Sequence, residues 1–346
     1  MLDQGSALSP DSSPILVTGV AGFIGFHVAR RLLSDGRRVV GLDNLNSYYD
    51  PRLKEARLSL LEAEPRFSFF RCDIAEAGRV REVAAATQVR EIIHLAAQAG
   101  VRWSVEHPHA YTHSNIAGTL EVLEAARHER VSHLVYASSS SVYGANTSVP
   151  FRETDDVSHP VSLYAATKLA NEAMAFAYSH LYGIPATGLR FFTVYGPWGR
   201  PDMAYFKFTR AILAGEPIDV FNHGKLRRDF TYIDDIVEGI VRVLASPPSP
   251  RASVGTTAVA SHRVFNIGND QPIDLESFIT ALENAIGQPA IRRLAPMQPG
   301  DVPATWADVS ALNDQVGFRP TTPLPDGLRQ FVKWYREYVG TGQISR

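Results

Sequence analysis

Tyr164 and Lys168 stand four residues apart in the segment "VSLYAATKLANEAMAFAYSHLYG", which begins at Val161. On a helix this spacing places both side chains on one face, about one turn apart. A nearby ammonium favours the phenolate, so it lowers the phenol's pKa from its usual value of about 10 toward the range of a general base. The pair therefore predicts proton transfer, although the same spacing is also common where a helix merely packs on its surface.

A run of serines occupies positions 138–141 in "HLVYASSSSVYG". The apolar "HLVYA" predicts a buried strand, so the serines stand where that strand ends. They are either a flexible low-complexity loop or hydroxyls placed for separate tasks. Their position in the chain, shortly before Tyr164 and after a glycine-rich turn, favours the second interpretation.

Gly19, Gly22 and Gly25 lie in "ILVTGVAGFIGFHVARRLL", where a predicted strand turns into a helix. Glycines there permit a tight turn, let backbone N–H groups approach a pyrophosphate, and let helix and strand pack closely. The spacing G-x-x-G-x-x-G also occurs in purely structural turns. A dinucleotide site therefore needs a second sign, namely an acid at the end of the next strand.

Asp43 ends the second predicted strand and is followed by Asn44. An acid in this place can bond both hydroxyls of a ribose and repels a 2'-phosphate, which favours NAD over NADP. A loop cap is the alternative role for Asp43. Asp73 and Ile74, after the next strand, are candidates for an adenine contact, and an ordinary surface-loop aspartate is the alternative there.

The elements that would position these residues alternate along the first half of the chain. Strands are predicted at "PILVTG", "RRVVGLD", "RFSFFRCD", "VREIIHLAA", "VSHLVYAS" and "ATGLRFF", and helices near 23–35, 51–63, 76–86, 115–128 and 162–181. This alternation predicts an α/β fold with a Rossmann-type doubly wound parallel sheet covered on both faces.

From about Tyr195 the pattern changes to loops, short strands and short helices. We predict a Rossmann domain over 14–194, to which segments near 228–245 and 263–270 return. A smaller mixed α/β substrate-binding region is predicted over 195–338. Residues 1–13 are polar and residues 246–262 are rich in Pro, Ser and Thr, so both segments are predicted to be flexible.

The composition is that of an ordinary globular protein. Of 346 residues, 45% are hydrophobic, and 34 basic and 36 acidic side chains give a net charge of -2, so no global field attracts nucleic acid or an anionic membrane. The single cysteine, Cys72, excludes an intramolecular disulfide and a cysteine-rich zinc site. No segment resembles a signal peptide or a membrane span, and we expect a cytoplasmic protein.

Taken together, the motifs resemble the extended short-chain dehydrogenase/reductase superfamily, within it the nucleotide-sugar epimerases and dehydratases. The resemblance covers residues 14 to about 338 and rests on "TGVAGFIG", "LDNLN", "CDI", "HLAAQAG", "ASSSSVYG", "YAATK", "LRFFTVYGP", "RRDFTYIDDI" and "PGDVPATWAD". It implies that Ser139 bonds the sugar's O4, that Tyr164 moves its proton, and that Lys168 bonds the nicotinamide ribose while lowering the tyrosine's pKa. The C4 hydride would be lent to NAD and returned to the other face of a 4-keto sugar.

The predicted cofactor site combines these motifs. Its residues are Gly19, Gly22, Phe23, Ile24, Gly25, Asp43, Asn44, Asn46, Asp73, Ile74, Leu95, Ala96, Ala97, Gln98, Ser138, Tyr164 and Lys168.

Ser141 stands where related dehydratases and decarboxylases carry Glu, which can act as an extra acid or base near C5. This difference favours epimerisation. The stretch "RFFTVYGPWGRPDMAYF" further resembles UDP-glucuronate 4-epimerases, which assigns Thr193 and Arg200 to the C6 carboxylate, since Arg offers two parallel N–H bonds. Arg102 and Ser140 are helpers in this assignment, and a solvated loop arginine is the alternative for Arg200.

By the same resemblance, Arg228 is assigned to the diphosphate and Asp301 to the uridine ribose, while Gln298 replaces an Arg of galactose epimerases. Asp234 and Asp235 are interpreted as acids that cap a helix start, so no metal is predicted.

The predicted reaction is NAD-dependent 4-epimerisation of UDP-glucuronate to UDP-galacturonate. A UDP-glucose/UDP-galactose 4-epimerase and a catalytically silent nucleotide-sugar binding protein are the alternatives. The family usually dimerises through two helices, here near 103–127 and 162–181, so a homodimer is expected.

Overall fold

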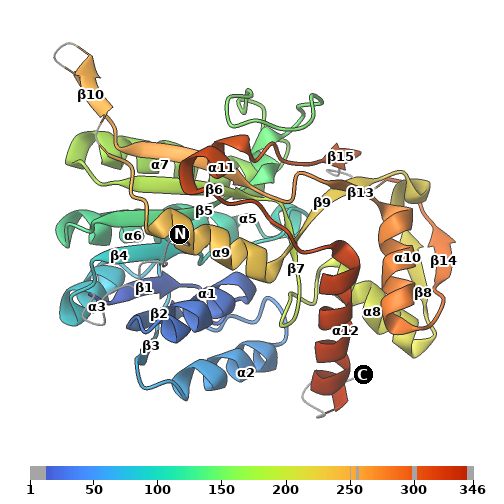
Figure 1. The fold of residues 1–346 in the computed structure, drawn as a ribbon. Coiled ribbons are helices and arrows are strands. Elements are labelled where there is room, and N and C mark those ends of the chain that lie inside the picture. Colours follow the sequence, from blue (N-terminus) through green and yellow to red (C-terminus); the bar gives the residue numbers. More distant parts are fainter. Residues whose placement is uncertain (1–12, 250, 255–256, 298–301, 341–346) are drawn as a thin grey trace, which may run out of the picture.

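The computed structural model describes residues 13–249, 251–254, 257–297 and 302–340, and a seven-stranded parallel sheet forms its centre (Figure 1). The strands are β1 (Ile15–Thr18), β2 (Val39–Asp43), β3 (Phe67–Arg71), β4 (Glu91–His94), β5 (His133–Ser139), β6 (Ala186–Phe191) and β12 (His262–Ile267). Their order is β12-β6-β5-β4-β1-β2-β3, and every neighbouring pair is parallel. The predicted doubly wound α/β fold is confirmed.

Helices cover both faces of this sheet (Figure 1). One layer contains α1 (Phe23–Ser34), α2 (Pro51–Glu62) and α9 (Ile233–Leu244), and the other contains α3 (Arg79–Thr87), α6 (Gly118–His128) and α7 (Leu163–Tyr182). Side chains of β1 alternate between the two layers: Ile15 and Val17 belong to one buried cluster and Leu16 to the other. Because both faces are buried, the strand is a continuous apolar run.

The helix predicted near 115–128 begins differently. The short helices α4 (Trp103–Glu106) and α5 (Pro108–Tyr111) and a π-helical segment, Thr112–Ala117, precede α6. Asn115 in that segment is buried; its Nδ2 donates to Gln98 O and Thr167 Oγ1, both at 3.0 Å, and its Oδ1 accepts from Gln98 N at 2.8 Å. The wider π-helical turn thus sets one amide between the loop after β4 and α7, as such turns often do near functional sites.

The second region contains two smaller sheets beside the central one (Figure 1). In the first, β9 (Arg227–Tyr232) pairs with β7 (Thr193–Tyr195), β13 (Pro272–Asp274) and β15 (Ala304–Thr305); in the second, β8 (Pro217–Val220) pairs with β14 (Ile291–Leu294). The helices here are α8 (Ala204–Ala214), α10 (Leu275–Ile286) and α12 (Leu324–Gly340), whereas α11 (Ser310–Val316) packs against β12 and α9. Among the described helices, none is long and apolar enough to cross a membrane.

The observed elements differ in detail from the predicted division of the chain. The boundary at 194/195 passes through β7, which pairs with β9 in the second region. Within 228–245, β9 stays in that sheet, and α9 returns to pack against α1 and β5. The segment 246–262 contains an antiparallel pair, β10 (Arg251–Val254) and β11 (Thr257–Val259), because its Val and Thr residues favour strands despite the surrounding prolines. Residues 1–12 lie outside the described residues.

Candidate active site

Two adjoining cavities open where the central sheet meets the second region. The first lies at the carboxyl ends of β1, β2, β4 and β5, where the strand order changes direction, which is the usual ligand site of such sheets. Every predicted cofactor residue lines it. The second is lined by the predicted substrate residues Arg102, Ser139, Ser140, Thr193, Arg200 and Arg228, whereas Gln298 and Asp301 lie outside the described residues. Ser139, Tyr164 and Arg200 border both cavities.

The glycine turn forms a tight cradle in which a Cβ would clash with neighbouring backbone. Gly19 has φ +70°, and a Cβ there would lie 2.8 Å from the nitrogen of Ala96. A Cβ on Gly25 would lie 2.1 Å from the carbonyl oxygen of Gly19. α1 begins at Phe23, and no side chain caps its N-terminal residue, Gly22. The first-turn N–H groups therefore face the cavity, and they suit a pyrophosphate.

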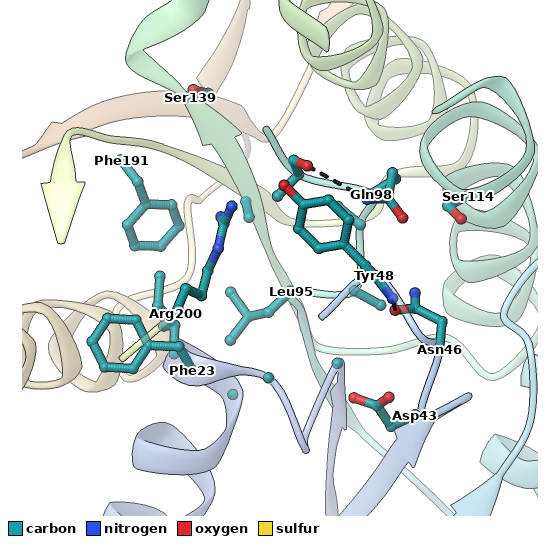
Figure 2. Close-up of a pocket in the computed structure, with 18 of the residues that line it drawn as sticks. Phe23, Asp43, Asn46, Tyr48, Leu95, Gln98, Ser114, Ser139, Phe191 and Arg200 are labelled. Atoms are coloured by element: carbon teal, nitrogen blue, oxygen red, sulfur yellow. Dashed lines mark hydrogen bonds between the residues drawn. The ribbon is translucent and has the colours of Figure 1, made fainter. Parts of the chain in front are cut away.

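Asp43 holds its carboxylate beside this turn. Its Oδ2 accepts from the N–H of Ala21 at 3.1 Å, and its Oδ1 accepts from the N–H of Leu45 at 2.8 Å. The side chain thus caps its own loop and lines the cavity at once, so the two roles considered for it are compatible (Figure 2). Its fixed oxygens suit the hydroxyls of a ribose.

Two neighbouring loops are fixed in the same way. Asp73 accepts from the N–H of Ala75 at 2.9 Å and from Asn44 Nδ2 at 3.2 Å, so its carboxylate supports the loop as well as lining the cavity. Lys54, which the sequence did not single out, donates to the carbonyl and side-chain oxygens of Asn46 at 2.8 and 2.7 Å. Burial lowers the pKa of Lys54 to about 8. The sequence alone did not show that Lys54 lies on the face of α2 that packs toward the cavity.

The four serines are not a loop. Ser138 and Ser139 end β5, and Ser140 and Ser141 begin a 3-10 helix, Ser140–Tyr143. The hydroxyl of Ser138 donates to Glu172 Oε1 at 2.5 Å, so this hydroxyl belongs to a buried ion-pair network, while the residue itself lines the first cavity. Ser139 Oγ accepts from the N–H of Ser141 at 3.2 Å and stays at the cavity.

Glu172 also pairs with Arg190 of β6, at 2.8 Å between Oε2 and Nη2. All three groups are nearly inaccessible, which keeps the carboxyl end of β5 fixed against α7.

Tyr164 and Lys168 do not interact as the sequence predicted. Lys168, 3% exposed, donates to the carbonyl oxygen of Ala137 at 2.9 Å, and no carboxylate within the described part of the chain pairs with it. Burial lowers the pKa of Lys168 to about 8. Burial also raises the pKa of Tyr164, and the opposing effects of Ser139 and Arg200 are smaller. The pKa of Tyr164 is therefore raised and not lowered as the sequence predicted, because desolvation exceeds the effect of the neighbouring groups.

Arg200 carries a counter-ion that the sequence did not reveal. Its Nε and Nη2 donate to the two oxygens of Asp202 at 3.1 and 2.6 Å, and Tyr48 donates to Asp202 Oδ2 at 3.1 Å. Figure 2 shows Arg200 and Tyr48 extending toward the end of β5 that carries Ser139. Asp202 raises the pKa of Arg200, although burial opposes this. Tyr48 comes from the loop after β2, so only the fold brings it to Asp202.

The loop that carries Arg200 is held from the cofactor side. Arg57 of α2 is fully buried and donates to the carbonyl of Ala21 at 2.9 Å and to that of Trp198 at 2.5 Å. His27 of α1 contacts the carbonyl of Pro197 at 2.9 Å. These bonds connect the glycine turn directly to the segment before Arg200.

The remaining substrate candidates lie around the second cavity. Thr193 begins β7 and Arg228 lies in β9, on neighbouring strands, while the guanidinium of Arg102 lies 5.5 Å from the ring centroid of Phe221. Among the described residues no group of three or more His, Cys, Asp or Glu could hold a metal. Asp234 and Asp235 lie in the first turn of α9, where acids favour the helix dipole, but the predicted cap is wrong: Tyr232 is the N-cap residue and no side chain caps this helix. Asp235 instead accepts from the N–H of Thr322 at 3.0 Å.

A parallel sheet whose glycine turn, strand-end acid and Ser-Tyr-Lys set converge on one cavity defines an NAD-dependent enzyme of the short-chain dehydrogenase/reductase type. The sequence pattern of the NAD dependent epimerase/dehydratase family matches residues 15–268, and the chain belongs to that family. NAD is its cofactor, and the glycine cradle and Asp43 fit that group.

The chain is similar to a probable UDP-glucuronate 4-epimerase from Rhizobium meliloti (strain 1021), with 48% identity over 92% of this chain and 96% of the relative. A crystal structure of UDP-glucuronic acid 4-epimerase from Bacillus cereus, in complex with UDP-glucuronic acid and NAD, matches with a TM-score of 0.84 and 33% identity over 94% of this chain and 99% of that one. UDP-glucose 4-epimerase from Thermotoga maritima, solved with UDP-glucose, matches with a TM-score of 0.82 and 29% identity over 94% and 99%.

Proposed function

We propose that this chain interconverts UDP-glucuronate and UDP-galacturonate by NAD-dependent epimerisation at C4. One observation carries the proposal: Arg200 lies at the junction of the two cavities, together with Ser139 and Tyr164. A sugar whose C4 faces Tyr164 would place a C6 carboxylate within the reach of this guanidinium. Similarity to UDP-glucuronate 4-epimerases supports the same substrate.

Each side chain then has a distinct task. Tyr164 removes the O4 proton when C4 is oxidised and returns a proton to O4 when C4 is reduced. Ser139 donates a hydrogen bond to O4. Lys168 donates to the ribose that lies beside the nicotinamide. When bound, NAD accepts the C4 hydrogen as hydride and gives it back to the opposite face of the ketone.

Ser141 supports epimerisation over elimination. It lines the second cavity in the position where a carboxylate would be needed for acid or base chemistry at C5. A serine hydroxyl does not ionise near neutral pH, so the C5 proton stays in place. Elimination from the 4-keto sugar is therefore not supported, and reduction back to either C4 epimer is favoured.

Thr193 and Arg200 also protect the substrate. A uronate oxidised at C4 is a β-keto acid, which loses CO₂ when its C5–C6 bond stands perpendicular to the carbonyl plane. Hydrogen bonds that hold the carboxylate charged and out of this alignment suppress that loss. Arg200→Ala and Thr193→Ala should release a UDP-pentose, detected by mass spectrometry. Unchanged epimerisation without this product would contradict the assignment.

The function is tested by incubating the purified protein with UDP-glucuronate and, separately, with UDP-glucose, without added NAD, and resolving the products by NMR. We expect UDP-galacturonate from the first substrate. Conversion of UDP-glucose alone would instead support the neutral-sugar epimerase that the Thermotoga maritima neighbour suggests. No turnover of either would support a silent binding protein.

We further propose a cytoplasmic homodimer. The outer surfaces of α6 and α7 expose large apolar side chains: Leu120 is 39%, Phe176 52% and Leu181 66% exposed. Exposed apolar side chains on neighbouring helices are typical of a surface that a partner covers. Light scattering after size-exclusion chromatography should give twice the mass of the chain, and Phe176→Glu should give the mass of one chain.

A further inference from the structure

Asp202 occupies only one edge of the Arg200 guanidinium. Nε and Nη2 donate to the carboxylate, whereas Nη1 has no hydrogen-bond partner among the described residues. The planar fork of arginine offers a second edge, formed by Nη1 and the other N–H of Nη2, which can receive another carboxylate. Arg200 and Asp202 are 24% and 29% exposed, so both are accessible to a ligand in the second cavity.

The orientation of Asp202 is fixed from a different part of the fold. Tyr48 donates to Asp202 Oδ2 at 3.1 Å, and its ring lies 6.0 Å from the Arg200 guanidinium carbon. The other charged side chains that line the second cavity are Arg102, Glu106, Lys207 and Arg228. Asp202 is thus the acid that directly neutralises Arg200. The two side chains together carry a net charge close to zero where they face the second cavity.

Epimerisation of a uronate makes conflicting demands on such a cation, if the proposed function holds. The carboxylate must be held while C4 reacts on one face. The 4-keto sugar must then turn so that the other face meets the same cofactor, and during this turn the carboxylate leaves its first position. A guanidinium without a counter-ion would bind the carboxylate most tightly in one orientation and oppose the turn.

We propose that Asp202 is a specificity-determining residue that competes with the substrate's carboxylate for Arg200, which weakens the hold on the uronate and permits the sugar to turn between the two transfers. Asp202 stays paired with Arg200 when the carboxylate leaves. No buried charge is then left alone during the turn. A neutral hexose has no carboxylate, so its binding is insensitive to this competition.

Asp202→Asn tests the proposal, because the amide keeps the shape and an acceptor oxygen but removes the charge. We expect KM for UDP-glucuronate to fall by about three- to tenfold and kcat to fall by a similar factor, with little change for UDP-glucose. Asp219→Asn is the matched control, since it removes one carboxylate from an exposed ion pair with Arg293. A higher KM for the uronate, an unchanged kcat, or equal changes with both sugars would overturn the proposal.

Binding measurements test the role of Asp202 without relying on turnover. In a Tyr164→Phe background with NAD bound, calorimetry should show tighter UDP-glucuronate binding after Asp202→Asn and after Asp202→Ser, and unchanged UDP-glucose binding. Equal affinity of all variants for the uronate would overturn the inference. If the wild-type protein converted no UDP-glucuronate, the proposed function would fail, whereas normal conversion with unaltered selectivity in Asp202→Asn would reject only the role of Asp202.

Discussion

The cofactor cavity and the sugar cavity share Tyr164 but are built in different ways. The first collects residues from consecutive strand ends of a single parallel sheet, each close to a motif in the sequence. The second collects residues from the segment after β4, the end of β5, β7, the loop before α8 and β9, so both regions of the molecule contribute to it. One cavity is thus formed mainly by the strand ends of one sheet, and the other is a composite of two regions.

The difference is clearest in the two cations. Lys168 donates to a backbone carbonyl, and no carboxylate among the described residues pairs with it. Arg200 is paired with Asp202. In the proposed mechanism the first cation bonds a neutral ribose, at the cost of a lowered pKa, whereas the second binds a carboxylate that must also be released, and its counter-ion weakens that binding.

The largest effect is expected for the residue that both cavities share. Tyr164→Phe removes the acid/base group but keeps the ring that fills the site, so kcat should fall by about 10²–10⁴-fold. Bound NAD and the affinity for UDP-glucuronate should be retained, as checked by absorbance of the released cofactor and by calorimetry. Activity above one tenth of the wild type would show that another group moves the proton.

A smaller effect should separate two serines that stand two residues apart. Ser139→Ala removes the hydroxyl beside Tyr164 and should lower kcat about 10–100-fold, because one hydrogen bond to the reacting oxygen is lost. Ser141→Ala is the matched control, since its hydroxyl has no assigned step, and its kcat should stay within about threefold of the wild type. Equal losses in both variants would mean that the strand end acts as a structural unit.

The sequence predicted the cofactor cavity far better than the sugar cavity. Gly19, Asp43 and the serines each lie at the carboxyl end of a strand, so their convergence was predictable from strand order in a parallel sheet. Asp202 stands two residues after Arg200, yet nothing local shows that it pairs with that arginine. Tyr48 reaches Asp202 across 154 positions. Such contacts depend on how the second region packs against the first, which local patterns do not contain.

Burial explains the errors inside the predicted site. The spacing of Tyr164 and Lys168 was correct for one helix face, but α7 is covered by β5 and by the π-helical segment, so desolvation raises the pKa of the phenol. Ser138 lines the first cavity, as the sequence predicted, but its hydroxyl donates to Glu172, a contact that the sequence did not show.

The smallest effect concerns the pH dependence that Lys168 confers. When protonated, Lys168 has three N–H donors and a charge that strengthens its bonds to the ribose and to the backbone carbonyl, whereas the neutral amine has two and no charge. Its pKa of about 8 means that this proton is lost as the pH rises through that value. The slope of log(kcat/KM) against pH should therefore decrease by one near pH 8. Lys168→Arg should be less active overall but should lack this inflection, since a guanidinium stays charged. An inflection that persists in the variant would assign it to another group.

In the proposed mechanism, the hydrogen at C4 leaves and returns to the same carbon without exchange with water, while Tyr164 moves only the O4 proton. The most direct test uses UDP-glucuronate carrying deuterium at C4, incubated in ordinary water and followed by NMR. We predict UDP-galacturonate that retains deuterium at C4 and acquires none of the solvent's hydrogen there or at C5. Loss of the label from C4, or solvent exchange at C5 during inversion, would contradict this mechanism.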